Sequence, residues 1–138
     1  RKKEMFKTSG GKYIAPQVIE NQMKQSLFIE QIMVVGENRK MPTALIQPNI
    51  EYITQWLKSK GIQTNSIDEA CKESDLITAI QEDINSHNTN FGTWEQIKKF
   101  ELIPEEWSID AGHLTPTMKL KRKVVKEKYN DIIEKMYA

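Results

Sequence analysis

Two short runs of apolar residues, most of them β-branched, constrain the fold more than any other feature of the sequence. They occupy positions 32–35 (Ile-Met-Val-Val) and 43–46 (Thr-Ala-Leu-Ile), and a polar stretch from Gly36 to Pro42 separates them. β-Branched and aliphatic residues favour strands, and a short polar connection favours an antiparallel hairpin. We therefore predict that these two runs are core strands, packed under the helix that precedes them.

Four segments have apolar residues at helical spacing, so they predict amphipathic helices that cover this sheet. The first spans residues 16–26: Pro16 suits the first helical turn, and Ile19, Met23 and Leu27 recur at four-residue intervals. The second ends near Gly61, and the other two span residues 73–87 and 120–136. Their apolar stripes are Ile50/Ile53/Leu57, Leu76/Ile77/Ile80/Ile84 and Val125/Tyr129/Ile132/Ile133/Met136.

Further extended segments complete the predicted fold. Residues 97–103 form a third core strand, and residues 3–8 and 12–14 form a separate hairpin with an exposed turn at Ser9-Gly10-Gly11, where glycine supplies the positive φ that tight turns need. The sequence thus predicts an α+β fold, with a small central sheet of about three strands flanked by helices and an N-terminal two-stranded hairpin. At 138 residues the chain fits one domain.

The composition narrows the class of protein. The apolar run 32–35 is far shorter than the roughly 20 residues that span a bilayer, and no signal-peptide pattern opens the chain, so we expect a cytoplasmic protein. Twenty basic and 19 acidic side chains give a net charge of +1, which offers no reason to expect nucleic acid as a partner. Cys71 lies among acidic residues without a nearby histidine, which favours a structural thiol. His87 and His113 fit no zinc-ligand spacing, so no metal site is predicted.

Two segments carry lysines where chemistry can use them. Ser9-Gly10-Gly11-Lys12 lacks the phosphate-loop pattern, so both a plain turn and a ligand-contacting loop fit it. Lys119 lies where the long irregular loop 104–119 passes into the last helix, which lets its side chain reach outward. The basic residues that follow, up to Lys128, are typical of a solvated helix face. The alternative for this run is a non-enzymatic module that binds anions or nucleic acid, although the three tryptophans, expected to be core or packing residues, are not interleaved with it.

Together the two segments resemble a known family. Residues 1–20, which begin Arg-Lys-Lys-Glu-Met-Phe-Lys-Thr-Ser-Gly-Gly-Lys, resemble the hinge and loop that open the C-terminal domain of adenylate-forming enzymes. Residues 114–122 (Leu-Thr-Pro-Thr-Met-Lys-Leu-Lys-Arg) resemble the catalytic-lysine motif of the same domain. With residues 100–107 and the extra stretch around 62–92, the resemblance is strongest to long-chain fatty-acid–CoA ligases, and it spans essentially the whole chain.

The resemblance implies a mobile C-terminal lid domain over residues 1–138, with a hinge and hairpin loop at 1–15 and a catalytic-lysine loop at 104–119. Because the chain begins at Arg1 inside what looks like a continuing motif, we expect a piece of a larger protein. Arg1 matches the residue that contacts the ribose hydroxyls of ATP, and Lys3 matches the hinge, where many relatives carry Asp.

The same motifs imply roles for the two loops. Lys119 matches the adenylation lysine, although this chain has Met118 where many relatives have a glycine, so we expect a stiffer lysine loop. The loop that faces the acyl-adenylate and coenzyme A in the thioester-forming pose is matched by Ser9, Gly10, Gly11 and Lys12.

The implied reaction converts ATP, a fatty acid and coenzyme A, through an acyl-adenylate, into acyl-CoA, AMP and pyrophosphate. A large N-terminal adenylate-binding domain is expected to bind most of the ATP, Mg²⁺ and coenzyme A, so this fragment alone is expected to be inactive. An alternative within the superfamily is the lid of a fatty acyl–AMP ligase or a peptide synthetase, whose acceptor is a carrier protein. Peripheral membrane association of the full enzyme is compatible with the resemblance.

Overall fold

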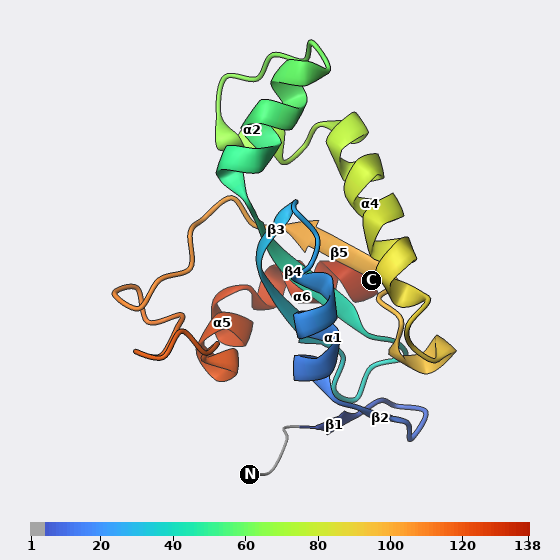
Figure 1. The fold of residues 1–138 in the computed structure, drawn as a ribbon. Helices are drawn as coiled ribbons and strands as arrows, with labels where there is room; N and C mark the ends of the chain where they lie inside the picture. Colours follow the sequence, from blue (N-terminus) through green and yellow to red (C-terminus); the bar gives the residue numbers. More distant parts are fainter. Residues whose placement is uncertain (1–4) are drawn as a thin grey trace.

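The central element of the fold is a three-stranded mixed sheet (Figure 1). The computed structural model describes residues 5–138. β3 and β4 pair antiparallel, which confirms the predicted hairpin of core strands, whereas β5 runs parallel to β4. The predicted strand at 97–103 is also confirmed, although it is only four residues long. The strands lie in the order β3-β4-β5 and span Ile29–Val35, Thr43–Pro48 and Lys99–Leu102.

The parallel pairing of β4 with β5 requires a long connection, because a tight turn cannot join parallel strands. The predicted helices that end near Gly61 and span 73–87 are confirmed as α2 and α4, and α4 leads the chain back toward the start of β5 (Figure 1). Among residues 5–138, no helix combines the length and the apolar character that crossing a membrane demands. The connection contains α2, α3, α4 and the 3-10 turn η1, which span Ile50–Ser59, Ile67–Ala70, Ser74–Asn88 and Thr93–Glu95.

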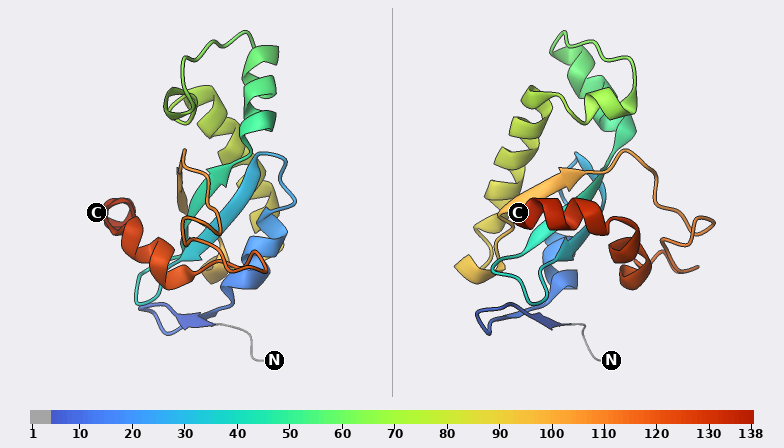
Figure 2. Two further views of the ribbon diagram at one scale, coloured as in Figure 1. Left: turned by 90° about the vertical axis from the view of Figure 1, so that its left-hand side faces the viewer. Right: turned by 180° about the vertical axis from the view of Figure 1, so that it is seen from behind.

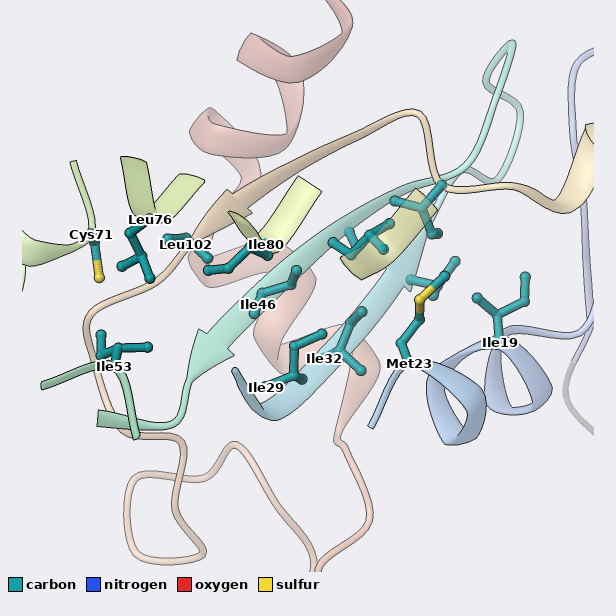
Figure 3. Packing of buried hydrophobic residues seen from close by; sticks show 14 of the residues in the cluster. Ile19, Met23, Ile29, Ile32, Ile46, Ile53, Cys71, Leu76, Ile80 and Leu102 are labelled. Carbon is teal, nitrogen blue, oxygen red and sulfur yellow. The ribbon is translucent and has the colours of Figure 1, made fainter. Parts of the chain in front are cut away.

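One face of the sheet packs against α1 (Pro16–Met23) and α4. Figure 3 shows Ile19 and Met23 of α1 in the same apolar cluster as Ile32 of β3 and Ile46 of β4. The α1 helix thus covers the predicted strand hairpin. Cys71 lies in this cluster, where burial and the nearby negative charge of Asp68 raise its pKa to about 11, as suits a structural thiol.

The opposite face packs against the C-terminal helices α5 (Arg122–Lys128) and α6 (Asn130–Tyr137), so the sheet lies between two helical layers (Figure 2). The prediction of one helix over 120–136 is wrong in its continuity: the chain leaves helical geometry at Tyr129, where φ is −106° and ψ is 22°. The apolar stripe continues across this break, so spacing could not reveal it. The residues buried on this side are Met33, Val35, Leu45, Ile103, Trp107, Val125, Tyr129, Ile133 and Met136.

The N-terminal hairpin is confirmed as β1 (Phe6–Lys7) and β2 (Tyr13–Ile14), both shorter than predicted. It is tied to the turn between β3 and β4 by backbone hydrogen bonds. The amide of Asn38 donates to the Lys7 carbonyl at 2.9 Å, and the amide of Ser9 donates to the Arg39 carbonyl at 2.8 Å. The hairpin loop is therefore supported by the sheet and does not hang free of it.

Three predicted packing residues are exposed. α1 ends at Met23, so Leu27 lies beyond the helix and is 66% exposed, because the chain already turns toward β3 there. Ile77 is 38% exposed because it lies off the buried stripe of α4, which Leu76, Ile80 and Ile84 form. Trp94 is 47% exposed in η1, so the expectation that every tryptophan packs inside is wrong for this one.

Candidate functional site

Lys119 lies in a small closed hairpin at the end of the long loop that follows β5. Leu114 and Leu120 form an antiparallel bridge at its base. Above the bridge, the amide of Thr115 donates to the Lys119 carbonyl and the amide of Met118 donates to the Thr115 carbonyl, both at 2.8 Å. The second position of this turn is Pro116, and the fixed φ of proline suits that position. The lysine thus stands on an ordered turn.

Met118 takes the left-handed backbone conformation in this turn, with φ of 65°. A side chain in this region costs about 1–2 kcal/mol relative to glycine, and Asn or Gly usually supplies it. The position is the one where the resembled motif has glycine, so the turn keeps a glycine-like backbone despite the substitution. Because methionine samples fewer backbone states than glycine, the loop is expected to be stiffer.

The Lys119 side chain points to solvent from this support. Its own amide donates to the Thr115 hydroxyl at 3.1 Å, and that hydroxyl lies 3.0 Å from the hydroxyl of Thr117. Lys119 itself is exposed. The hydrogen bonds therefore fix the backbone under the lysine and leave its ammonium group available to a ligand.

A partly buried polar cluster anchors the loop behind Lys119. The backbone amide of Trp107 donates to Gln47 Oε1 at 2.9 Å, and its indole Nε1–H donates to the Tyr129 hydroxyl at 3.2 Å. That hydroxyl donates in turn to Glu105 Oε1 at 2.6 Å. This bond and Lys128 hold the pKa of Glu105 below its usual value, while burial raises the pKa of Tyr129. The tyrosine therefore stays a neutral donor to a charged acceptor.

His113 closes the other side of this cluster and is almost fully buried. Its Nδ1 accepts from the Ser108 amide at 3.3 Å, and its carbonyl accepts from the Lys121 amide at 2.8 Å. Burial lowers the pKa of His113, and the nearby positive charge of Lys128 lowers it further. The imidazole is thus held neutral, which suits an acceptor inside the loop.

The second candidate site, the hairpin loop at residues 8–12, lies on the N-terminal hairpin. The Thr8 amide donates to the Lys12 carbonyl at 2.9 Å and the Gly11 amide to the Thr8 carbonyl at 3.0 Å, while Gly11 has a φ of 82°. Ser9, Gly10 and Gly11 are exposed, as predicted. The Lys12 ammonium lies 5.5 Å from the ring centre of Trp94, so an exposed aromatic side chain steadies the lysine.

The structure does not bring the two loops together. In Figure 1 and in the right-hand view of Figure 2, the orange loop that leads to α5 and the blue N-terminal hairpin extend in different directions. Arg1 and Lys3, the predicted nucleotide contact and hinge, lie outside the described residues.

Comparison with known proteins identifies the family. A family model described as the AMP-binding enzyme C-terminal domain matches residues 4–138. The chain belongs to this family. Among its relatives, a long-chain-fatty-acid–CoA ligase of Mycobacterium tuberculosis is 39% identical over 99% of this chain and 23% of its own length. Long-chain-fatty-acid–CoA ligase 1 of Homo sapiens is 37% identical over 100% of this chain and 20% of its own length.

Solved structures show the same fold for this AMP-binding C-terminal domain. The adenylation domain of a carboxylate reductase from Mycobacterium chelonae matches with a TM-score of 0.77 and 21% identity, over 96% of this chain and 19% of that one. An adenylation and carrier didomain of a carboxylic acid reductase from Segniliparus rugosus, solved with AMP, matches with a TM-score of 0.75 at 21% identity, over 99% of this chain and 18% of that one. The domain thus spans about a fifth of the length of these relatives.

Sequence inspection missed the residues that support the two loops of this C-terminal domain. A partly buried ion pair joins Glu20 of α1 to Arg122 of α5, and no local pattern links residues 102 positions apart. The sequence also gives no sign that His113 is buried behind the lysine loop. Across residues 5–138 the structure shows no group of three or more histidine, cysteine or acidic residues that could hold a metal ion.

Proposed function

We propose that this chain is the C-terminal lid domain of a long-chain fatty-acid–CoA ligase, and that Lys119 acts in its adenylation step. The observation that carries the proposal is the position of Lys119: an exposed lysine on a closed, buttressed turn, in a domain whose relatives are named long-chain-fatty-acid–CoA ligases. In the complete enzyme, an N-terminal domain would bind most of the ATP and Mg²⁺, together with the acyl chain.

Lys119 would act by electrostatic stabilisation. Negative charge moves between the fatty carboxylate and the α-phosphate as the acyl-adenylate forms and pyrophosphate leaves. An ammonium group held ready at that point stabilises the transition state without reorganising first. The turn at Thr115 and Met118 would preorganise the lysine, because it fixes the backbone from which the side chain extends.

The hairpin loop at residues 8–12 would act in the second half-reaction, in which the thiol of coenzyme A attacks the acyl carbonyl and AMP leaves. Gly10 and Gly11 present backbone without side chains, so a narrow ligand such as pantetheine can pass close to it. Since the two loops extend in different directions, we propose that the domain rotates about a hinge near Lys3 between the half-reactions, and that Arg1 contacts the ATP ribose.

Substitution of Lys119 in the complete ligase tests this proposal. Lys119→Ala should slow acyl-adenylate formation by at least about 100-fold, the effect of removing one preorganised donor. Thioester formation from preformed acyl-adenylate should change by less than about threefold, because the lysine would then face away. Lys123→Ala, an exposed lysine on α5, is the control. Equal losses in both half-reactions would rule out the role.

A second candidate keeps the adenylation step and replaces coenzyme A by a carrier protein as acceptor. It is favoured by the fold of the carboxylic acid reductase adenylation domains, one of which was solved with its carrier domain. Acceptor assays that offer either coenzyme A or a phosphopantetheine-loaded carrier protein to the same acyl-adenylate distinguish the two.

A non-enzymatic module for anions or nucleic acid finds less support. Several cations of the basic run are engaged by carboxylates: Arg122 by Glu20, Lys126 by Glu37 and Lys128 by Glu105. A polyanion would have to displace these partners. A cytoplasmic location and peripheral membrane contact of the complete enzyme stay predictions from the sequence.

A further inference from the structure

An ion pair between α1 and α5 lies just behind the lysine loop. Arg122 is the first residue of α5 and follows Lys119 by three positions. Its guanidinium binds both carboxylate oxygens of Glu20, with Nη1 2.7 Å from Oε2 and Nη2 2.5 Å from Oε1. Glu20 is only 5% exposed, and its Oε2 also accepts from the backbone amide of Val34 at 2.8 Å. One carboxylate thus joins α1, the edge strand β3 and the start of α5.

This pair is poorly explained as a source of stability. Burial raises the pKa of Glu20, and this outweighs the opposing effect of the Arg122 charge. Buried ion pairs often contribute no more stability than apolar residues of the same volume, because both charges lose their hydration. A bidentate guanidinium–carboxylate contact does, however, fix distance and angle together, which a single ammonium or an apolar contact does not. Its benefit therefore lies in orientation.

The segment whose orientation it sets carries Lys119. The lysine stands between two fixed points: the Thr115 turn on one side, and Arg122 at the helix start on the other. The Lys121 amide, between Lys119 and Arg122, is bonded to the His113 carbonyl. We propose that Glu20 and Arg122 are positioning residues for Lys119, which hold the start of α5 so that the lysine is aimed at the reacting carboxylate and phosphate. This inference rests on the proposed adenylation role of Lys119.

The decisive variant removes the orientation while avoiding an unpaired buried charge. In the double variant Glu20→Gln/Arg122→Met, the glutamine oxygen can still accept from Val34, and the methionine fills the space of the arginine stem. In the complete ligase we expect a 10- to 100-fold lower rate of acyl-adenylate formation, the cost of misplacing a catalytic group by about 1 Å. Thioester formation from preformed acyl-adenylate should stay within about twofold, and Arg122→Lys should give an intermediate loss. A purely structural role would lower both half-reactions together.

Lys126→Met is a matched control, because it removes another ion pair of the same helix. Lys126 lies 3.9 Å from Glu37, and both side chains are about half exposed. This pair makes no contact with the lysine hairpin that would set its direction, so both half-reactions should stay within about twofold.

Amide hydrogen exchange gives a readout that does not depend on activity. In the double variant, the amides of Met118, Lys119 and Lys121 should exchange at least about tenfold faster, while those of β4 stay protected. In Lys126→Met all of them should exchange as in the wild type. If Lys119→Ala fails to slow adenylation selectively, the proposed function falls, but the exchange result still tests the positioning. If Lys119→Ala behaves as expected while the double variant keeps normal adenylation and exchange, or loses both half-reactions equally, the inference is overturned.

Discussion

Removing one oxygen atom, in the variant Tyr129→Phe, tests how the lysine loop is held on the sheet. The Tyr129 hydroxyl accepts from the buried indole of Trp107 and donates to Glu105. Phenylalanine keeps the ring, so the packing against α5 and α6 is retained and only these two hydrogen bonds are lost. The variant therefore isolates the polar contribution of the cluster.

The expected loss follows from the burial of each partner. The Trp107 residue is 3% exposed, so its Nε1–H is left without an acceptor, at a cost of about 1–3 kcal/mol. The Glu105 side chain is 52% exposed and water can replace the tyrosine, so that bond contributes at most about 1 kcal/mol. The sum is about 1–4 kcal/mol. At roughly 3 °C per kcal/mol for a domain of this size, the unfolding midpoint should fall by about 3–12 °C.

Urea and thermal unfolding, followed by circular dichroism on the 138-residue chain, measure this loss. Tyr13→Phe is the control: Tyr13 is 60% exposed, so its free energy of unfolding should change by less than about 0.5 kcal/mol. If Tyr129→Phe also stays within 0.5 kcal/mol, water replaces the hydroxyl at Trp107, and the cluster does not anchor the loop as argued.

Three further perturbations test separate parts of the structure. Because burial lowers the pKa of His113 from its usual 6.5, the unfolded chain takes up a proton at this residue before the folded chain does as the pH falls. The free energy of unfolding should therefore decrease as the pH drops below about 6.5. Urea unfolding of His113→Asn at several pH values should show a weaker dependence on pH. Met118→Gly relieves the strain of the left-handed backbone but adds conformational freedom to the unfolded chain. The free energy of unfolding should therefore rise by between zero and about 1 kcal/mol, and a decrease of more than about 0.5 kcal/mol would contradict the strain. Asn88→Ala removes both side-chain hydrogen bonds to the backbone of Ile97 and should lower the free energy of unfolding, measured by urea titration, by about 3 kcal/mol. Asn85 is exposed, so Asn85→Ala should change the free energy of unfolding little.

Much of the architecture could be predicted from the sequence, because the residues that build it carry strong local patterns. The strands at 32–35 and 43–46 combine β-branched composition with a short connection, and the stripe Leu76/Ile80/Ile84 marks α4. The failures occur where the tertiary structure overrides spacing. Leu27 continues the period of α1, yet the chain has already turned into β3, and the break at Tyr129 interrupts an unbroken stripe.

The candidate site was predictable only in part. The sequence predicts Lys119 only at the end of a long irregular loop, whereas the structure contains a closed turn there. Pro116, which favours the second position of a turn, is the signal that could have indicated it. Its supports could not be predicted: the contacts of Trp107 with Tyr129 and of Glu20 with Arg122 join segments that only the folded sheet brings together. Charge patterns did not help, because Glu20 and Arg122 each have several possible partners of opposite charge along the chain.

The two loops are supported by largely different contacts, and these bear on the proposed role of the domain as a lid in two half-reactions. The hairpin loop rests on the turn between β3 and β4 through the Arg39 carbonyl, and the Arg39 side chain stacks on the ring of Tyr137 in α6. The lysine loop rests on the Glu20–Arg122 pair and the Tyr129 cluster. A domain that rotates as proposed must keep one loop ordered while the other is engaged, so a shared support would couple the two proposed half-reactions. Apart from the exposed Lys126–Glu37 pair, which joins α5 to the turn between β3 and β4, the two sets of contacts are distinct, so we expect substitutions behind one loop to affect one proposed half-reaction alone.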